Sequence, residues 1–218
     1  MIPDARTRRV LAAYPDARSR AHALARVLTC PVEPVLEALP SSGRLLEVGC
    51  GHGLFSLLSA ERSPALDVVG VDIDADKIAV ARRATESLGL ADRVDLRATD
   101  GSLPDGPFDA VLCVDVLYLL GPERGAALLE RMADAITDRG IVVVKEMSDR
   151  PAWKSRWNHL QEVGATRVFG YTEGDELEVL APGQITTPLR GAGLRVTERR
   201  LDRWYPHPHL LVTAHAVG

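Results

Sequence analysis

The chain has 218 residues, which is long enough for one α/β domain with a well-filled core, and its net charge is −4. This charge provides no overall positive field, so we expect no nucleic-acid partner. No apolar run is long enough to span a bilayer, and residues 1–6 lack the apolar core of a signal peptide. Cys30, Cys50 and Cys113 are scattered, with neither metal-ligand nor disulfide spacing. We therefore expect a reduced cytoplasmic protein without a metal site or membrane insertion.

The first part of the chain is predicted to be helical and to stand apart from the strand–helix alternation that follows. We divide the chain into an N-terminal helical lid or cap, 1–39, and a main domain, 40–218. One N-terminal helix is predicted from apolar residues at helical spacing: Ala17, Ala21, Leu24 and Leu28. Six arginines lie in the first 30 residues: Arg6, Arg8, Arg9, Arg18, Arg20 and Arg26. They favour a solvated helix face, the alternative being a lid that recognises an anionic acceptor.

The main domain alternates between apolar strands and amphipathic helices. Buried strands are predicted at 44–48, 67–71, 94–98, 108–114 and 141–144. Helices are predicted at 54–60, from an Asp74 cap to a Gly89 C-cap, and from Gly121 to Gly140 with Ile136 on the buried face. Such alternation predicts a parallel sheet with helices on both faces and a ligand site at the carboxyl ends of the strands.

The last third of the chain carries weaker signals. A helix is predicted at 149–161, and a short helix is predicted to begin at Thr187-Pro188 and end near Gly193. Segments 194–201 and 209–216 alternate in hydrophobicity and predict an antiparallel strand pair.

A glycine-rich turn follows the first strand of the main domain. After Glu47, glycines occupy alternate positions, Gly49, Gly51 and Gly53, and an apolar helix begins at once. Glycines let a ligand approach the backbone, and a helix start offers unpaired N–H groups to an anionic ligand group. A dinucleotide-binding turn requires glycine at its sixth position, which here is Leu54. The spacing therefore argues against NAD.

Acidic residues follow three further strands, at Asp72, Asp100 and Asp115. A single aspartate at a strand end is often only a turn or helix cap. The order and spacing of these residues after an E/D-x-G-x-G-x-G turn, however, resemble class I S-adenosylmethionine (SAM)-dependent methyltransferases over residues 43–147. The resemblance implies a Rossmann-like, seven-stranded, mostly parallel sheet with helices on both faces and an antiparallel final strand pair. It also implies SAM as methyl donor and S-adenosylhomocysteine as product.

The resemblance assigns the glycine turn to the amino-acid part of the donor. Gly49, Cys50, Gly51 and Gly53 would pass beneath the methionine part, with Glu47 nearby.

The other strand ends would hold the nucleoside. Asp72 would accept from both ribose hydroxyls, and Ile73 would lie against the adenine face. Asp100 would accept from the adenine amine, with Gly101 giving a backbone contact. Asp115 and its successors would line the sulfonium end and the acceptor site.

Methyl transfer depends mainly on holding the acceptor atom against the methyl group, and a base is needed only for a protonated acceptor. The candidates are Tyr118, Glu146 and His159, although Glu146 could instead pair with Lys145 or Lys154, and His159 could serve packing.

The acceptor pocket is less defined. Aromatic side chains could form it, or they could pack in a core: Trp153, Trp157, Phe169 and Tyr171. His207 and His209 have no third ligand in sight, so we predict no metal there.

The place of the Asn/Asp-Pro-Pro-Tyr/Phe motif, typical of enzymes that methylate base amines or glutamine amides, reads Asp115-Val116-Leu117-Tyr118. We therefore expect a small-molecule acceptor, with specialised metabolism as one candidate setting. We also expect a monomer or homodimer. The alternatives are a protein or peptide methyltransferase, or a SAM-binding protein of this fold with another role. Abundant alanine and arginine are typical of a high-GC bacterial gene.

Overall fold

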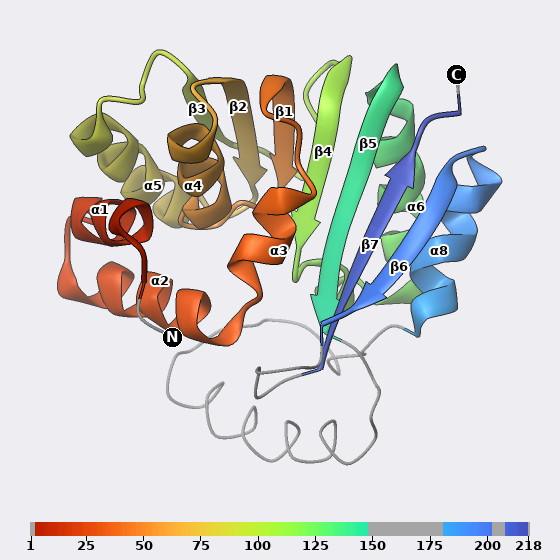
Figure 1. Cartoon of the computed structure of the whole chain (residues 1–218), viewed down its shortest axis with the longest axis horizontal. Helices are drawn as coiled ribbons and strands as arrows, with labels where there is room; N and C mark the ends of the chain where they lie inside the picture. Colours follow the sequence, from red (N-terminus) through yellow and green to blue (C-terminus); the bar gives the residue numbers. More distant parts are fainter. Residues whose placement is uncertain (1–2, 148–180, 202–207, 218) are drawn as a thin grey trace.

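A seven-stranded sheet runs through the protein in the order β3-β2-β1-β4-β5-β7-β6 (Figure 1). The computed structural model describes residues 3–147, 181–201 and 208–217. The strands are β1 Ser42–Val48, β2 Ala65–Asp72, β3 Val94–Ala98, β4 Phe108–Val114, β5 Ile136–Met147, β6 Arg195–Arg200 and β7 His209–His215. The predicted strands are thus confirmed, including the final pair.

The first five strands are parallel to one another, and β7 is antiparallel to both β5 and β6. In the register, Val48 lies opposite Val71 of β2 and Cys113 of β4. The carboxyl ends of β1, β2 and β4 therefore meet at one edge, which is where a parallel sheet binds ligands. This arrangement confirms the Rossmann-like prediction.

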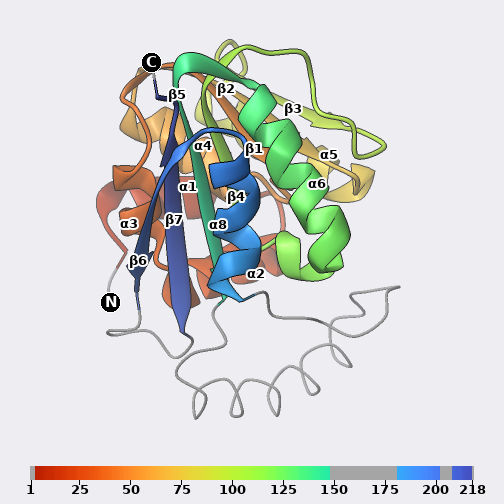
Figure 2. The same ribbon diagram turned by 90° about the vertical axis from the view of Figure 1, so that its right-hand side faces the viewer.

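Helices cover both faces of the sheet (Figure 2). One layer contains α1 Ala5–Ala13, α3 Val32–Glu37, α4 Leu54–Arg62 and α5 Ala75–Leu88. The other contains the 3₁₀ helix η1 Leu117–Leu119, α6 Gly121–Asp134 and α8 Pro182–Gly191. The helix α2 Ala17–Thr29 lies at the carboxyl edge of the sheet (Figure 1).

The caps of α5 follow the prediction. The Asp74 carboxylate accepts hydrogen bonds from the N–H groups of Asp76 and Lys77. Gly89 adopts a left-handed conformation with φ 69°, and Leu90 is buried behind it. These local signals fix where the helix that follows Asp72 begins and ends.

The N-terminal helices share the core of the main sheet. Val10, Tyr14 and Val35 are buried in the same apolar cluster as α4 and α5. The predicted helix is present as α2, but the spaced apolar residues do not form its buried face, because Leu24 and Leu28 are 39% and 48% exposed. A helix that crosses strand ends meets loops and polar groups there, and α2 turns its small residues inward: Ser19 and Ala23.

Two helix boundaries differ from the prediction. The helix α6 ends at Asp134, and Ile136 instead opens β5, where it pairs with Phe108. The helix α8 begins at Pro182, so Pro188 lies inside it rather than in its first turn. The predicted helix at 149–161, with His159 and the aromatic side chains at 153, 157, 169 and 171, lies outside the described residues, as does His207.

Within the described parts of the chain, no helix is long and apolar enough to cross a membrane.

Candidate functional site

The glycine turn leaves the end of β1 as a tight, left-handed backbone segment. Gly49, Gly51 and Gly53 have φ values of 70°, 53° and 76°, a region that disfavours other residues. The N–H groups of Gly49 and Cys50 both donate to the carbonyl of Val71, at 2.8 and 3.0 Å. The turn is therefore anchored to β2.

Asp72 connects this turn to the next helix. Its Oδ2 accepts from the Gly51 N–H at 2.7 Å, and its Oδ1 accepts from the Asp74 N–H at 2.9 Å. Each carboxylate oxygen keeps a further lone pair, so a pair of hydroxyl groups could still donate to it. A side-chain carbon built at Gly51 would have no atom closer than 3.9 Å, so there is room beside the turn.

The ends of β2 and β3 extend this row. Ile73 is 76% exposed, which is unusual for a large apolar side chain beside a buried sheet. The N–H of Thr99 donates to the carbonyl of Asp72 at 2.9 Å, which brings Asp100 close to the end of β2. Asp100 is exposed, and hydrogen bonds from Ser102 lower its pKa. An exposed apolar side chain and an ionised carboxylate thus lie next to Asp72.

Glu47 lies beneath the turn rather than at the edge. Its carboxylate is buried and accepts a hydrogen bond from the Ser56 hydroxyl of α4. Desolvation raises the pKa of Glu47 to about 7, against the opposing effect of the Ser56 hydrogen bond. Tyr14 approaches the turn from α1, and its hydroxyl donates to the carbonyl of His52 at 3.1 Å. Sequence reasoning missed Tyr14 and Ser56, since neither lies in the motif.

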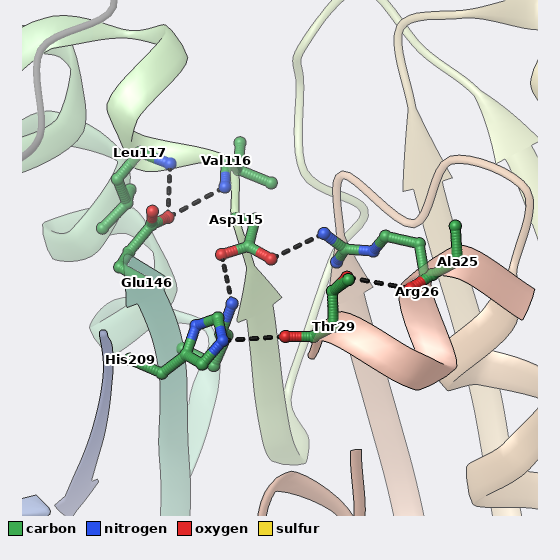
Figure 3. A network of polar contacts seen from close by, with 9 residues as sticks. Ala25, Arg26, Thr29, Asp115, Val116, Leu117, Glu146 and His209 are labelled. Carbon is green, nitrogen blue, oxygen red and sulfur yellow. Dashed lines mark hydrogen bonds and ion pairs between the residues drawn. The ribbon is translucent and has the colours of Figure 1, made fainter. Parts of the chain in front are cut away.

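A buried ionic network lies at the end of β4 (Figure 3). Asp115 accepts from Arg26 Nη1 through Oδ2 and from Lys145 Nζ through Oδ1, both at 2.6 Å. Its side chain is 7% exposed and that of Lys145 is 1% exposed. Desolvation raises the pKa of Asp115, but the two cations outweigh this effect and hold the pKa well below its usual range. Asp115 is therefore ionised, with both oxygens engaged.

Glu146 lies near the end of β5, as predicted, but its carboxyl is buried. Its Oε1 accepts both from the N–H of Val116 at 2.8 Å and from the N–H of Leu117 at 2.7 Å (Figure 3). Burial raises the pKa of Glu146, and the negative charge of Asp115 raises it further. The pairing with Lys145 considered from the sequence is wrong, because Lys145 binds Asp115. Tyr118 follows in η1 and is half-buried.

The helix α2 contacts three separate strand ends. Arg26 binds Asp115 after β4, and the ring of His22 lies 4.8 Å from the ring of His52 in the glycine turn. The carbonyl of Thr29 accepts from His209 Nε2 at the start of β7, at 2.9 Å (Figure 3).

The other N-terminal arginines with described contacts bind elsewhere. Arg8 donates to the Pro3 carbonyl, Arg9 contacts Glu61 and Arg20 donates to the Tyr14 carbonyl. Arg26 is thus the arginine of α2 that the described contacts place at the end of β4.

The donor set along β1, β2 and β3 fits SAM. The open backbone beside Gly51 suits the methionine part, Asp72 has lone pairs for hydroxyl groups, and Ile73 offers an apolar surface for adenine. Asp100 adds an acceptor for an amine. Among the described residues, no group of three or more His, Cys, Asp or Glu is placed to hold a metal ion.

Comparison with known proteins agrees with this geometry. A family described as "Methyltransferase domain" matches residues 46–142. The ubiquinone biosynthesis O-methyltransferase of Rhodopseudomonas palustris is 30% identical over 193 residues, covering 80% of this chain and 70% of that protein. An uncharacterised protein of Synechococcus, syc1184_c, is 30% identical over 165 residues, or 74% of this chain. This chain spans 38% of the length of the Synechococcus protein.

The fold has a close counterpart among solved structures. The SAM-dependent methyltransferase SibL superposes with a TM-score of 0.71 and 26% identity, covering 95% of this chain and 61% of that chain. With the glycine turn, the row of strand-end residues and the matched relatives together, the chain belongs to the class I SAM-dependent methyltransferases.

Proposed function

We propose that this chain transfers the methyl group of SAM to a small-molecule acceptor and releases S-adenosylhomocysteine. The observation that carries the proposal is the row formed by the glycine turn, Asp72, Ile73 and Asp100 at adjoining strand ends. The Rhodopseudomonas relative is named an O-methyltransferase, which favours oxygen as the atom that accepts the methyl group.

Each residue of the row has a proposed role. The turn from Gly49 to Gly53 holds the methionine part, and Asp72 binds the ribose hydroxyls. Ile73 covers one face of the adenine, while Asp100 and Gly101 bind its edge. Support comes from the open backbone at Gly51 and from the ionised, exposed carboxylate of Asp100.

SAM supplies a methyl group already activated by a positive sulfur, so the protein contributes mainly orientation. Asp115 is poorly suited as a base, because each of its oxygens binds a cation and its pKa is low. Glu146 is also poorly suited, because its carboxyl is buried and is bonded to backbone N–H groups. We propose that Tyr118 is the group of the β4 loop that contacts the acceptor.

Release of S-adenosylhomocysteine tests the proposed reaction. The protein would be incubated with SAM and a panel of phenols, alcohols, carboxylic acids and amines, and the product would be quantified by mass spectrometry. We expect methylation of a hydroxyl-bearing small molecule, with Asp100→Ala impaired and the exposed Asp92→Ala unaffected. Transfer to protein substrates, with none to the panel, would contradict the proposed acceptor class.

A further inference from the structure

We propose that Glu146 is a positioning residue that braces the SAM-binding glycine turn through the loop after β4. This inference rests on the proposed function, since it concerns how the same donor site keeps its shape. Glu146 itself contacts neither the glycine turn nor the row along β1, β2 and β3 in the described contacts; it acts through Val116.

The first step is the hydrogen bonding of Glu146 to the loop backbone. One oxygen, Oε1, accepts from two successive N–H groups, those of Val116 and Leu117, at 2.8 and 2.7 Å (Figure 3). The bond from Leu117 is buried and the bond from Val116 is partly buried, and Glu146 itself is 2% exposed. Without this acceptor, two backbone N–H groups would lose their partner in a largely buried place, which is costly.

The second step is the conformation of the loop. Asp115 has φ 55°, a value that is unfavourable for a residue with a side chain. The ion pairs to Arg26 and Lys145 hold its side chain on one side, while Glu146 holds the following backbone on the other. The loop is therefore fixed at two successive points, and its geometry depends on both.

The third step is contact with the glycine turn. A side-chain carbon built at Gly49 would lie 2.4 Å from Cγ2 of Val116, so the Val116 side chain packs directly over the Gly49 backbone. Gly49 itself has φ 70° and donates to the Val71 carbonyl on its other side. The turn is thus held between β2 and Val116, and a shift of Val116 would leave Gly49 unsupported.

The geometry also separates bracing from base catalysis. Bracing needs one acceptor oxygen at the Oε1 position, which the amide of glutamine also provides. A base needs a carboxylate that can take a proton, which glutamine lacks. The Glu146→Gln variant therefore keeps the proposed bracing role and loses any role as a general base.

The test compares S-adenosylhomocysteine binding by calorimetry in wild type, Glu146→Gln, Glu146→Leu and Val116→Ala. Glu130→Leu, on the exposed face of α6, serves as the matched control. We expect Glu146→Gln and the control to bind within about threefold of wild type, and Glu146→Leu to bind at least about tenfold more weakly. Val116→Ala should weaken binding by about threefold to tenfold, and a melting curve establishes that the variant is folded at the temperature of the titration.

Equal loss in Glu146→Gln and Glu146→Leu would overturn the proposal, and so would unchanged binding in Val116→Ala. If Glu146→Leu does not fold, the binding of S-adenosylhomocysteine by Glu146→Gln and by Val116→Ala still tests the proposal. Failure of the wild-type protein to bind S-adenosylhomocysteine would instead refute the proposed function, so the two failures are distinguishable.

Discussion

Three buried carboxyl groups near the ends of β1, β4 and β5 differ in charge because their neighbours differ. Glu47 meets a hydroxyl, Asp115 meets two cations and Glu146 meets two backbone N–H groups. The sequence predicted that all three follow or end strands, and this is where they lie. It could not predict their charge, because the partner Arg26 is 89 residues away from Asp115.

Glu47 should make the stability depend on pH. Its folded-state pKa of about 7 lies above the usual value of 4.5, so the folded protein binds the proton more tightly. The stabilisation is complete below pH 4.5 and is lost as the pH rises through 7. Arg26 opposes the shift and Asp72 adds to it.

We therefore expect the free energy of unfolding of Glu47→Gln, measured relative to that of wild type, to rise by about 2 kcal/mol from pH 5 to pH 8. Urea unfolding at both values measures this difference, with the exposed Glu130→Gln as control. A constant difference between the Glu47→Gln and wild-type free energies across this range would contradict the raised pKa.

Asp72 should affect both binding and stability. Replacement by alanine removes the acceptor for the Gly51 and Asp74 N–H groups as well as the proposed ribose contacts. We expect Asp72→Ala to lose S-adenosylhomocysteine binding by at least about tenfold and to melt at a lower temperature than wild type. Asp72→Asn keeps one acceptor oxygen and should lie between the two in melting temperature. An Asp72→Ala variant that binds as tightly as wild type would show that Asp72 is only a structural cap.

At the scale of elements, α2 is where sequence patterns were least informative. Its apolar residues Leu24 and Leu28 point outward, while Arg26 points inward to a carboxylate. Hydrophobic periodicity finds a face that packs on an apolar core, and α2 instead packs over strand ends. The segment 1–30 also contributes Val10 and Tyr14 to the core, so its deletion would disturb the fold as well as any lid.

Arg26 is a better probe of α2 than deletion. Arg26→Met leaves Asp115 with Lys145 alone, and we expect the free energy of unfolding to fall by about 1–3 kcal/mol at pH 7. Arg18→Met, on the exposed face of the same helix, should change it by less than about 0.5 kcal/mol. Chemical denaturation measures the free energy of unfolding of both variants. Equal losses in Arg26→Met and Arg18→Met would mean that the Arg26–Asp115 contact contributes no stability.

Apart from the start of β5, the strands were predicted within a few residues of their observed limits, because central strands are apolar on both faces. The start of β5 was missed, since Ile136 continues the helical spacing of Leu129 and Met132 and only its pairing with Phe108 excludes helix. The start of α8 was missed because both Pro182 and Pro188 suit the first turn of a helix. Neither error affects the donor site.

At the scale of the whole molecule, the site divides along the sheet. The ends of β1, β2 and β3 carry the residues proposed to bind SAM, and these were predictable because they lie in a compact motif. The end of β4 and the start of β7 are joined to α2 by the Arg26–Asp115 and Thr29–His209 contacts, and β5 is joined to the end of β4 by Lys145. This half depends on contacts between distant segments, so its arrangement emerged only from the structure.

The most direct test of the account is calorimetric titration of the wild-type protein with S-adenosylhomocysteine and, separately, with NAD. We predict saturable binding of S-adenosylhomocysteine, and a melting temperature that rises with its concentration because the ligand binds the folded state. Asp100→Ala should bind more weakly, whereas Asp92→Ala, exposed and outside the site, should match wild type. NAD should give no heat of binding. Binding of NAD without binding of S-adenosylhomocysteine would contradict the assignment of the glycine turn and, with it, the proposed function.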